Sequence, residues 1–406
     1  MGNSSEDLAH QKTLLRTAFL LFFLLGLSAN LILALVAFMQ DLLSLQYSKA
    51  MYILLSSHGA FFFSCPLSGL AISRYGYNKV IRVGTIFASL GCFILAATID
   101  RKIFGLLLLG TGVLGVGMSN LIVAINPLVF QLGKKSEALS RLSLAHFFAA
   151  LGMLGAPFIA SFFLNIPLNG IQDGFYQLDI LYCIIGSLWL LAYICLFYCC
   201  PKDLTAKKTG PSKEIWKNIL ASPGLLPCFM ALFVYVGCEV SIGCFLIDYM
   251  QDPKTQALPL TFATKYTTIY WGGLMIGRLI GARALLNYSP AKILLRHATV
   301  GIILLSLSLY LKAPTPTFLL LATGLVNSIM YPAIFSLGMG KTPTDNATIS
   351  SILCMANIGG SMLPFLQGIV ADLWGITNSF VVPLGAYAVI FSYASVFFLK
   401  NQTKKF

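Results

Sequence analysis

Charged residues are scarce in this chain of 406 residues. They make up 10% of it, whereas apolar residues make up 57%. An average soluble domain carries about 25% charged residues, and less than half of that share cannot cover the surface of a water-soluble particle of this size. A soluble enzyme, a disordered chain and a fibrous repeat are therefore excluded. The mean hydropathy of +0.82 indicates that lipid is the solvent for most of the apolar surface.

The sequence also lacks the common catalytic and metal-binding motifs. It contains no Gly-rich phosphate loop, no H-E-x-x-H helix and no nucleophile–base pattern. The ten cysteines form no C-x2-C pair with a second pair downstream, so we expect no zinc or iron–sulfur site and no cofactor. We do not expect an enzyme. The alternative, a polytopic membrane enzyme or a sensor, would need a catalytic constellation at one membrane face.

Long apolar runs fill most of the chain, each with the length of a membrane-spanning helix. The predicted segments are 15–39, 48–72, 80–98, 105–131, 142–164, 177–200, 224–247, 262–284, 293–311, 317–338, 347–371 and 379–399. None shows the ten-residue alternation of an outer-membrane barrel. A long charged stretch at 201–220 divides these twelve segments into two sets of six. We expect one six-helix bundle at 1–200, a cytoplasmic linker at 201–220 and a second bundle at 221–406.

The net charge of +13 is explained by membrane topology. If the N-terminus is cytoplasmic, 20 of the 27 Lys and Arg residues fall in cytoplasmic loops and tails, 6 fall outside and Arg278 lies within a helix. The opposite orientation would reverse this bias, so we expect both termini in the cytoplasm. No basic stripe with interleaved aromatics is present, which argues against a nucleic-acid partner.

An internal repeat relates the two sets of segments. Residues 127–133 read PLVFQLG and residues 332–338 read PAIFSLG, an offset of 205 residues. In the fifth and eleventh segments a glycine, Gly152 or Gly359, precedes a Pro-Phe pair by five residues. Segment n therefore corresponds to segment n+6, and an even number of helices per repeat gives both halves the same orientation. The prediction is an all-α polytopic membrane protein, with twelve transmembrane helices in two six-helix pseudo-repeats.

This architecture resembles an alternating-access carrier of the major facilitator type, which binds its solute near the midplane between the halves. The loop at 69–79 resembles the superfamily loop in which glycine, an acid, arginine and lysine form a cytoplasmic hinge and latch. Ser73 stands where the acid is usual. The resemblance implies a gating role for Arg74 and Lys79; the alternative is that they act only as topology charges.

A narrower resemblance covers about residues 20–399. The motifs GVG at 115–117 and RLSLAHFF at 141–148 are similar to those of the bacterial fucose–proton and glucose/galactose–proton symporter family. The second half adds YVGCEVSIG at 235–243, close to the glucose/galactose branch, and YPAIFSLG at 331–338. The resemblance implies the major facilitator fold and transport of a sugar with a proton.

The chain departs from this family at two positions. The fucose branch carries acids in its first and fourth helices, and these serve proton coupling and substrate binding. By spacing, Leu33 and Ile122 stand at those positions. Neither side chain titrates or forms hydrogen bonds, so the proton mechanism of the family does not transfer directly.

Glu239 is the strongest remaining candidate for proton coupling. It lies near the middle of the seventh segment, with Tyr235 one turn earlier on the same helix face. A carboxylate at membrane depth is protonated, partnered or functional. His146, in the fifth segment, stands where the family has a polar sugar-contacting residue, and a histidine there can carry a proton. For both residues the alternative is a hydrogen bond or packing between helices, and for His58 packing is the favoured interpretation.

Amide, phenol and indole side chains complete the predicted site, since amides and phenols both donate and accept hydrogen bonds to neutral polyols. The expected substrate-binding residues are Asn126, His146, Tyr235, Glu239, Trp271, Asn327, Tyr331 and Asn357, and the expected proton-coupling residues are Glu239 and His146. The expected gating residues are Arg74, Lys79, Arg278 and Asp372. Arg278 either snorkels to the interface or latches a closed state, and Asp372 forms an external latch or a solvated cap.

The predicted function is secondary transport of a small neutral solute, a monosaccharide with a proton as the leading interpretation. An exporter of drugs or metabolites and a sugar uniporter remain as alternatives. We expect a monomer in the bacterial inner membrane, with solute, proton and lipid as its partners and no metal.

Overall fold

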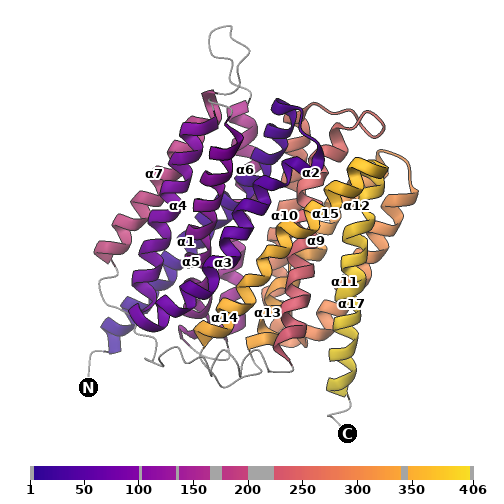
Figure 1. Cartoon of the computed structure of the whole chain (residues 1–406). Coiled ribbons are helices and arrows are strands. Elements are labelled where there is room, and N and C mark those ends of the chain that lie inside the picture. Colours follow the sequence, from indigo (N-terminus) through magenta and orange to yellow (C-terminus); the bar gives the residue numbers. More distant parts are fainter. Residues whose placement is uncertain are drawn as a thin grey trace.

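The computed structural model describes residues 4–99, 103–133, 137–164, 176–199, 224–339 and 346–402, which are almost entirely helical (Figure 1). The predicted linker at 201–220 lies outside these residues. The first half contains α1 (Ser4–Leu43), α2 (Tyr47–Ala50), α3 (Tyr52–Tyr75), α4 (Tyr77–Ile99), α5 (Phe104–Gln131), α6 (Ala138–Leu164) and α7 (Tyr176–Cys199). The second contains α9 (Leu225–Gln251), α10 (Leu260–Asn287), α11 (Pro290–Tyr310), α12 (Thr315–Asn327), α13 (Met330–Met339), α14 (Asn346–Met355), η2 (Ala356–Ile358), α15 (Gly359–Trp374), α16 (Ile376–Ser379) and α17 (Val381–Gln402).

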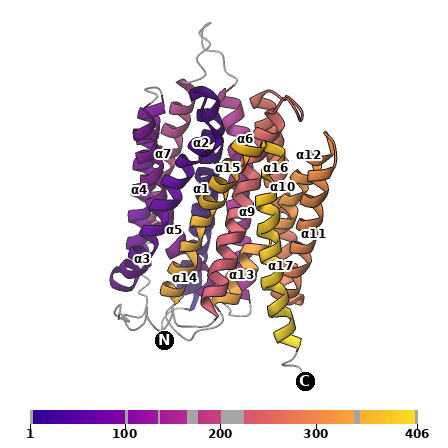
Figure 2. The same ribbon diagram turned by 45° about the vertical axis from the view of Figure 1, so that its right-hand side comes forward.

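The helices confirm the predicted spans. Within the described residues, eleven helical stretches are long and apolar enough to cross a membrane. The helix α10 fills the place of the remaining predicted segment, 262–284, and is less apolar because it carries Lys265, Arg278 and Arg283. The helices run alongside one another in two groups, and both ends of the chain lie at the same end of the bundle (Figures 1 and 2).

Two of the predicted spans are interrupted near the middle of the bundle. Ser328 and Ile329 separate α12 from α13, and a turn of 3-10 helix, η2, separates α14 from α15. Pro332 follows the first break. Proline has no N–H, so the carbonyl four residues earlier, that of Ser328, loses its helical partner. Such a carbonyl is available to a side chain from another helix.

Glycine contacts repeat between the halves and confirm the pseudo-repeat. A Cβ added to Gly152 of α6 would overlap the carbonyl oxygen of Phe23 on α1. A Cβ added to Gly359 of α15 would overlap the carbonyl oxygen of Phe233 on α9. The first contact joins the fifth span to the first, and the second contact joins the eleventh span to the seventh. Close backbone approach through small residues is how helices associate in lipid, where the hydrophobic effect between helices is weak.

We predict that Gly152→Ala and Gly359→Ala each destabilise the bundle. The added methyl group must displace a backbone carbonyl, and overpacking of this kind costs about 1–3 kcal/mol or more. Thermal unfolding in detergent should show a lowered midpoint for both. The control is Gly385→Ala in α17, where an added Cβ meets no atom within 4 Å. Equal midpoints for all three variants and the parent would contradict the contact.

Candidate functional site

A cavity of about 180 Å³ lies between the two halves. The first half lines it from α1, α3, α5 and α6, and the second from α9, α10, α13 and η2. Its volume is below the roughly 300–1,000 Å³ of pockets for drug-sized ligands, which indicates a small solute. Apolar side chains such as Phe22, Phe61 and Val236 make up much of the wall, with polar groups interspersed.

The cavity brings together five of the eight predicted substrate-binding residues. His146, Glu239, Trp271, Tyr331 and Asn357 line it. The other three, Asn126, Tyr235 and Asn327, are fully buried outside its wall. Four further polar residues outside the expected set of eight line the cavity; they are Asn30, Ser57, His58 and Arg278.

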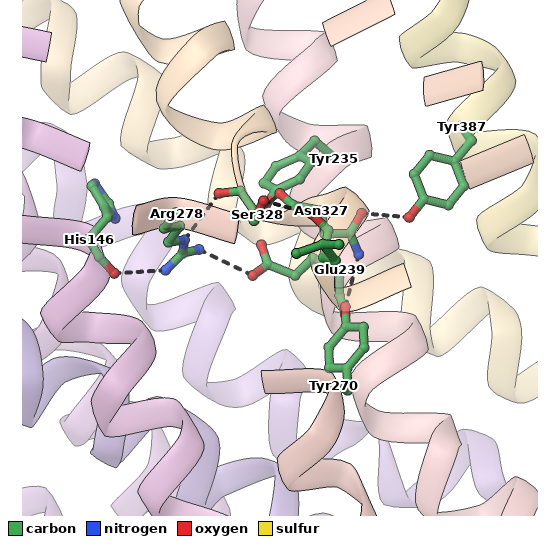
Figure 3. A network of polar contacts seen from close by, with 9 residues as sticks. His146, Tyr235, Glu239, Tyr270, Arg278, Asn327, Ser328 and Tyr387 are labelled. Atoms are coloured by element: carbon green, nitrogen blue, oxygen red, sulfur yellow. Dashed lines mark hydrogen bonds and ion pairs between the residues drawn. The ribbon is translucent and has the colours of Figure 1, made fainter. Parts of the chain in front are cut away.

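Arg278 and Glu239 form a buried ion pair at the cavity wall. Arg278 Nη2 lies 3.4 Å from Glu239 Oε1, and the two residues are 3% and 6% exposed. Arg278 does not reach the membrane interface; it projects from α10 between the halves (Figure 3). Burial of either charge alone would be costly, so each residue makes the other tolerable in this position.

The same guanidinium also joins the two halves. Arg278 Nη1 donates to the carbonyl of His146 on α6 at 3.0 Å, and Nε donates to the carbonyl of Ser328 at 3.3 Å. The Ser328 carbonyl is the one that Pro332 leaves without a helical partner. Ser143 of α6 donates back to the carbonyl of Arg278 at 3.2 Å. Arg278 therefore links Glu239, the broken span and the first half in one network.

A proline in the first half, Pro157, also leaves a carbonyl without its helical partner. Pro157 of α6 leaves the carbonyl of Met153 without its helical partner, and Asn30 of α1 donates Nδ2 to that carbonyl at 2.6 Å. Asn30 is 2% exposed and lies one turn before Leu33 on the same face of α1. The proline in one helix thus positions a polar side chain of another beside the cavity.

Asn327 is a supporting residue rather than part of the wall. Its Nδ2 donates to the Tyr270 hydroxyl at 2.9 Å, and its Oδ1 accepts from the Tyr387 hydroxyl at 2.6 Å. Tyr270 in turn donates to the backbone carbonyl of Glu239 at 2.9 Å, and Tyr235 donates to the Asn327 carbonyl at 2.9 Å (Figure 3). These bonds tie α9, α10, α12 and α17 together behind the ion pair and fix the position of Glu239.

His146 presents an unpaired ring nitrogen in aromatic surroundings. Its ring centroid lies 5.1 Å from that of Phe22 and 5.2 Å from that of Tyr331. Among the described residues, Nε2 of His146 and the Ser57 hydroxyl are buried atoms without a hydrogen-bond partner. An unsatisfied buried polar group is costly, and a ligand hydroxyl in the cavity can supply the missing partner.

Both positions that depart from the family pattern face the same cavity. Leu33 and Ile122 line its wall, where the resemblance implies acids. Among the described residues that line the cavity, Glu239 is the single carboxylate, and it is paired with Arg278. The wall therefore carries no net charge from these two groups, which favours a neutral ligand.

The predicted gating residues lie at different depths. Asp372 ends α15 and accepts the backbone N–H groups of Tyr47 and Ser48, each at 3.1 Å. This carboxylate therefore caps the start of α2 in the other half. Arg74 and Lys79 are exposed on either side of the turn between α3 and α4, towards the end of the bundle that carries the termini. The Arg74 guanidinium lies 5.3 Å from the Tyr75 ring centroid.

We predict that Asp372→Asn loosens the end of the bundle opposite the termini. The loss of a charged cap costs about 1 kcal/mol, which should raise the population of states open at that end about fivefold. The readout is labelling of Ser57→Cys in the cavity wall by a membrane-impermeant maleimide. The control is Asp179→Asn, because that exposed carboxylate accepts a backbone N–H, at 2.7 Å, from the adjacent Ile180 of its own helix. Equal labelling rates in both variants would exclude a gate at Asp372.

Two six-helix halves of the same orientation around a central, mostly apolar cavity define a polytopic membrane carrier. The chain belongs to the Major Facilitator Superfamily, whose profile matches residues 18–353.

Known proteins similar to this chain cover nearly all of it. The "Glucose/galactose transporter" of Brucella abortus is 33% identical in an alignment of 389 positions that covers 93% of this chain and 92% of that protein. The "L-fucose-proton symporter" of Escherichia coli K12 is 26% identical in an alignment of 399 positions that covers 92% of this chain and 90% of that protein. A crystal structure of the transporter FucP in the outward conformation has a TM-score of 0.74 at 24% identity, covering 94% of this chain and 98% of that one.

Proposed function

We propose that this protein is a symporter that carries a neutral monosaccharide together with a proton by alternating access. The observation that carries the proposal is the cavity itself. It is small, its one carboxylate among the described residues is paired, and it holds unpartnered polar atoms for a hydroxylated ligand. The names of the relatives from Brucella abortus and Escherichia coli support a sugar as the solute. The bacterial relatives and the apolar spanning helices support placement in a bacterial inner membrane, and the distribution of basic residues favours a cytoplasmic location for both termini.

Glu239 is the proposed proton site. Protonation would make its side chain neutral and end its ion pair with Arg278, which also binds the His146 carbonyl of the first half. A change in protonation would therefore alter a contact between the halves, which is what coupling of a proton to alternating access requires. His146, whose Nε2 has no protein partner, is the proposed second participant.

Uniport is the second candidate, because a specific observation favours it. Leu33 and Ile122 line the cavity at the positions where the resemblance implies acids. A carrier that lacks both acids needs another proton site or moves its solute without a proton. Whether Glu239 couples transport to a proton therefore distinguishes the symporter from the uniporter.

Binding and exchange of monosaccharides test the proposed substrate class. A transported sugar stabilises the purified protein against heat by mass action, by about 2.7 kcal/mol at a concentration 100 times its dissociation constant. We expect D-glucose or D-galactose to raise the unfolding temperature and to exchange across proteoliposome membranes without a gradient. If no monosaccharide does either, the solute is not a sugar.

A further inference from the structure

Two amides beside the cavity direct their nitrogen atoms to the protein. Asn30 donates Nδ2 to the Met153 carbonyl at 2.6 Å, and Asn357 donates Nδ2 to the Cys354 carbonyl at 2.9 Å. Each amide also has an oxygen, which only accepts hydrogen bonds. One N–H of each amide is thus bonded to the protein, and the oxygen of each remains available to accept a hydrogen bond from a ligand.

His58 of α3 likewise turns its donor nitrogen to the protein and leaves an acceptor nitrogen. Its Nδ1 lies 3.1 Å from the carbonyl oxygen of Leu54. A carbonyl carries no hydrogen, so Nδ1 must be the protonated nitrogen, and in a neutral imidazole Nε2 is then an acceptor. Nε2 points across to the second half, because a Cβ added to Gly360 would lie 2.9 Å from it. The Nε2 edge of the imidazole therefore packs against Gly360, where a larger residue would displace it, and His58 lines the cavity.

The charged groups of the wall supply both acceptors and donors. Glu239 contributes a carboxylate, which accepts hydrogen bonds when ionised. Arg278 has its Nε, Nη1 and Nη2 directed to Ser328, His146 and Glu239. Three of its five N–H groups are thus held by the protein, and acceptors from both halves remain at the wall.

We propose that the cavity binds its solute through hydrogen-bond acceptors from both halves beside its donors, and that His58 Nε2 is the acceptor for one hydroxyl of the solute. It therefore binds neutral solutes that donate several hydroxyl hydrogens, and it rejects analogues that lack those hydrogens. This inference rests on the proposed sugar transport and defines the chemistry of that site. It gives His58 a role in substrate binding, where its sequence context favours packing alone.

Fluorine substitution distinguishes acceptor walls from donor walls. A deoxyfluoro sugar keeps a weak acceptor where the hydroxyl was but has no hydrogen to donate, whereas a deoxy sugar lacks both. The probes are D-galactose and D-glucose with their monodeoxy and monodeoxyfluoro analogues, and the readout is competition with the labelled parent sugar. At the position bonded to His58 we expect the deoxyfluoro analogue to bind as weakly as the deoxy analogue, about five- to hundredfold below the parent sugar.

Variants at position 58 assign one hydroxyl to His58. In His58→Leu the parent sugar should bind about five- to tenfold more weakly, and at one position the parent, deoxy and deoxyfluoro sugars should become equivalent. His58→Asn, which keeps a donor for Leu54 and an acceptor, should restore part of the discrimination. The control is His297→Leu, because His297 Nδ1 lies 2.7 Å from the Val326 carbonyl but the residue does not line the cavity.

The outcomes separate this inference from the function on which it rests. If deoxyfluoro analogues bind like the parent sugar, the wall acts through donors and the inference is wrong while sugar transport stands. If His58→Leu changes no affinity, His58 is a packing residue and its role in the inference is wrong. If the wild-type protein binds neither parent sugar, the proposed function fails and the inference fails with it.

Discussion

Glu239→Gln is expected to abolish sugar accumulation driven by a proton gradient while leaving sugar exchange in place. The glutamine keeps the shape and hydrogen-bonding capacity of a protonated glutamate but cannot release a proton. A gradient of one pH unit supplies about 1.4 kcal/mol per proton, enough for about tenfold accumulation by the wild type. The variant should stop at equal concentrations on both sides of the membrane.

The measurement is uptake of labelled sugar into proteoliposomes, with and without an inward proton gradient, and exchange at equal pH. Asp248→Asn is a matched control, because Asp248 is a buried carboxylate on the same helix that does not line the cavity. It should accumulate sugar as the wild type does. Gradient-driven accumulation by Glu239→Gln would remove Glu239 from proton coupling and return the search to other residues.

Arg278→Gln is expected to destabilise the protein more than the double variant Arg278→Gln/Glu239→Gln. Removal of the cation alone leaves a buried carboxylate without its partner, at a cost of about 3–5 kcal/mol. Removal of both charges relieves that cost, although the links from Arg278 to His146 and Ser328 are lost in either case. The coupling free energy of the pair is the penalty of the double variant minus the sum of the penalties of Arg278→Gln and Glu239→Gln alone.

Thermal unfolding of the four proteins in detergent measures this coupling. Glu137→Gln is the control, since the side chain of Glu137 is 58% exposed and pairs at 4.0 Å with Arg141 on α6. An exposed pair of this kind contributes about 0–1 kcal/mol. If the penalty of the double variant equals the sum of the two single-variant penalties, the Arg278–Glu239 contact does not stabilise the folded protein.

The span positions and the pseudo-repeat were predictable from sequence because they depend on local composition. An apolar run of helix length predicts a membrane span without any knowledge of the helices that pack against it. Gly152 and Gly359 stand at corresponding positions of the repeat. The same two glycines prove to be the close contacts of matched helix pairs. Within the described residues, the helices follow the predicted segments one for one, with breaks added in the tenth and eleventh.

The cavity wall was harder to predict because its positions depend on contacts between helices. Asn30 is placed by a carbonyl that Pro157 frees on a different helix, and Arg278 by one that Pro332 frees. Each proline is visible in the sequence, but its partner is not. Asn327 illustrates the reverse case, because a buried amide at membrane depth looks like a ligand contact and here supports the wall through Tyr270 and Tyr387.

The central claim is that sugar and proton move together through the cavity that Glu239 and Arg278 line. The most direct test is simultaneous recording of sugar uptake and internal pH in proteoliposomes of the wild-type protein. The account predicts that D-glucose or D-galactose added outside enters together with protons, and that an inward proton gradient drives accumulation of that sugar. Sugar entry that equilibrates without any change in internal pH would contradict it and identify a uniporter.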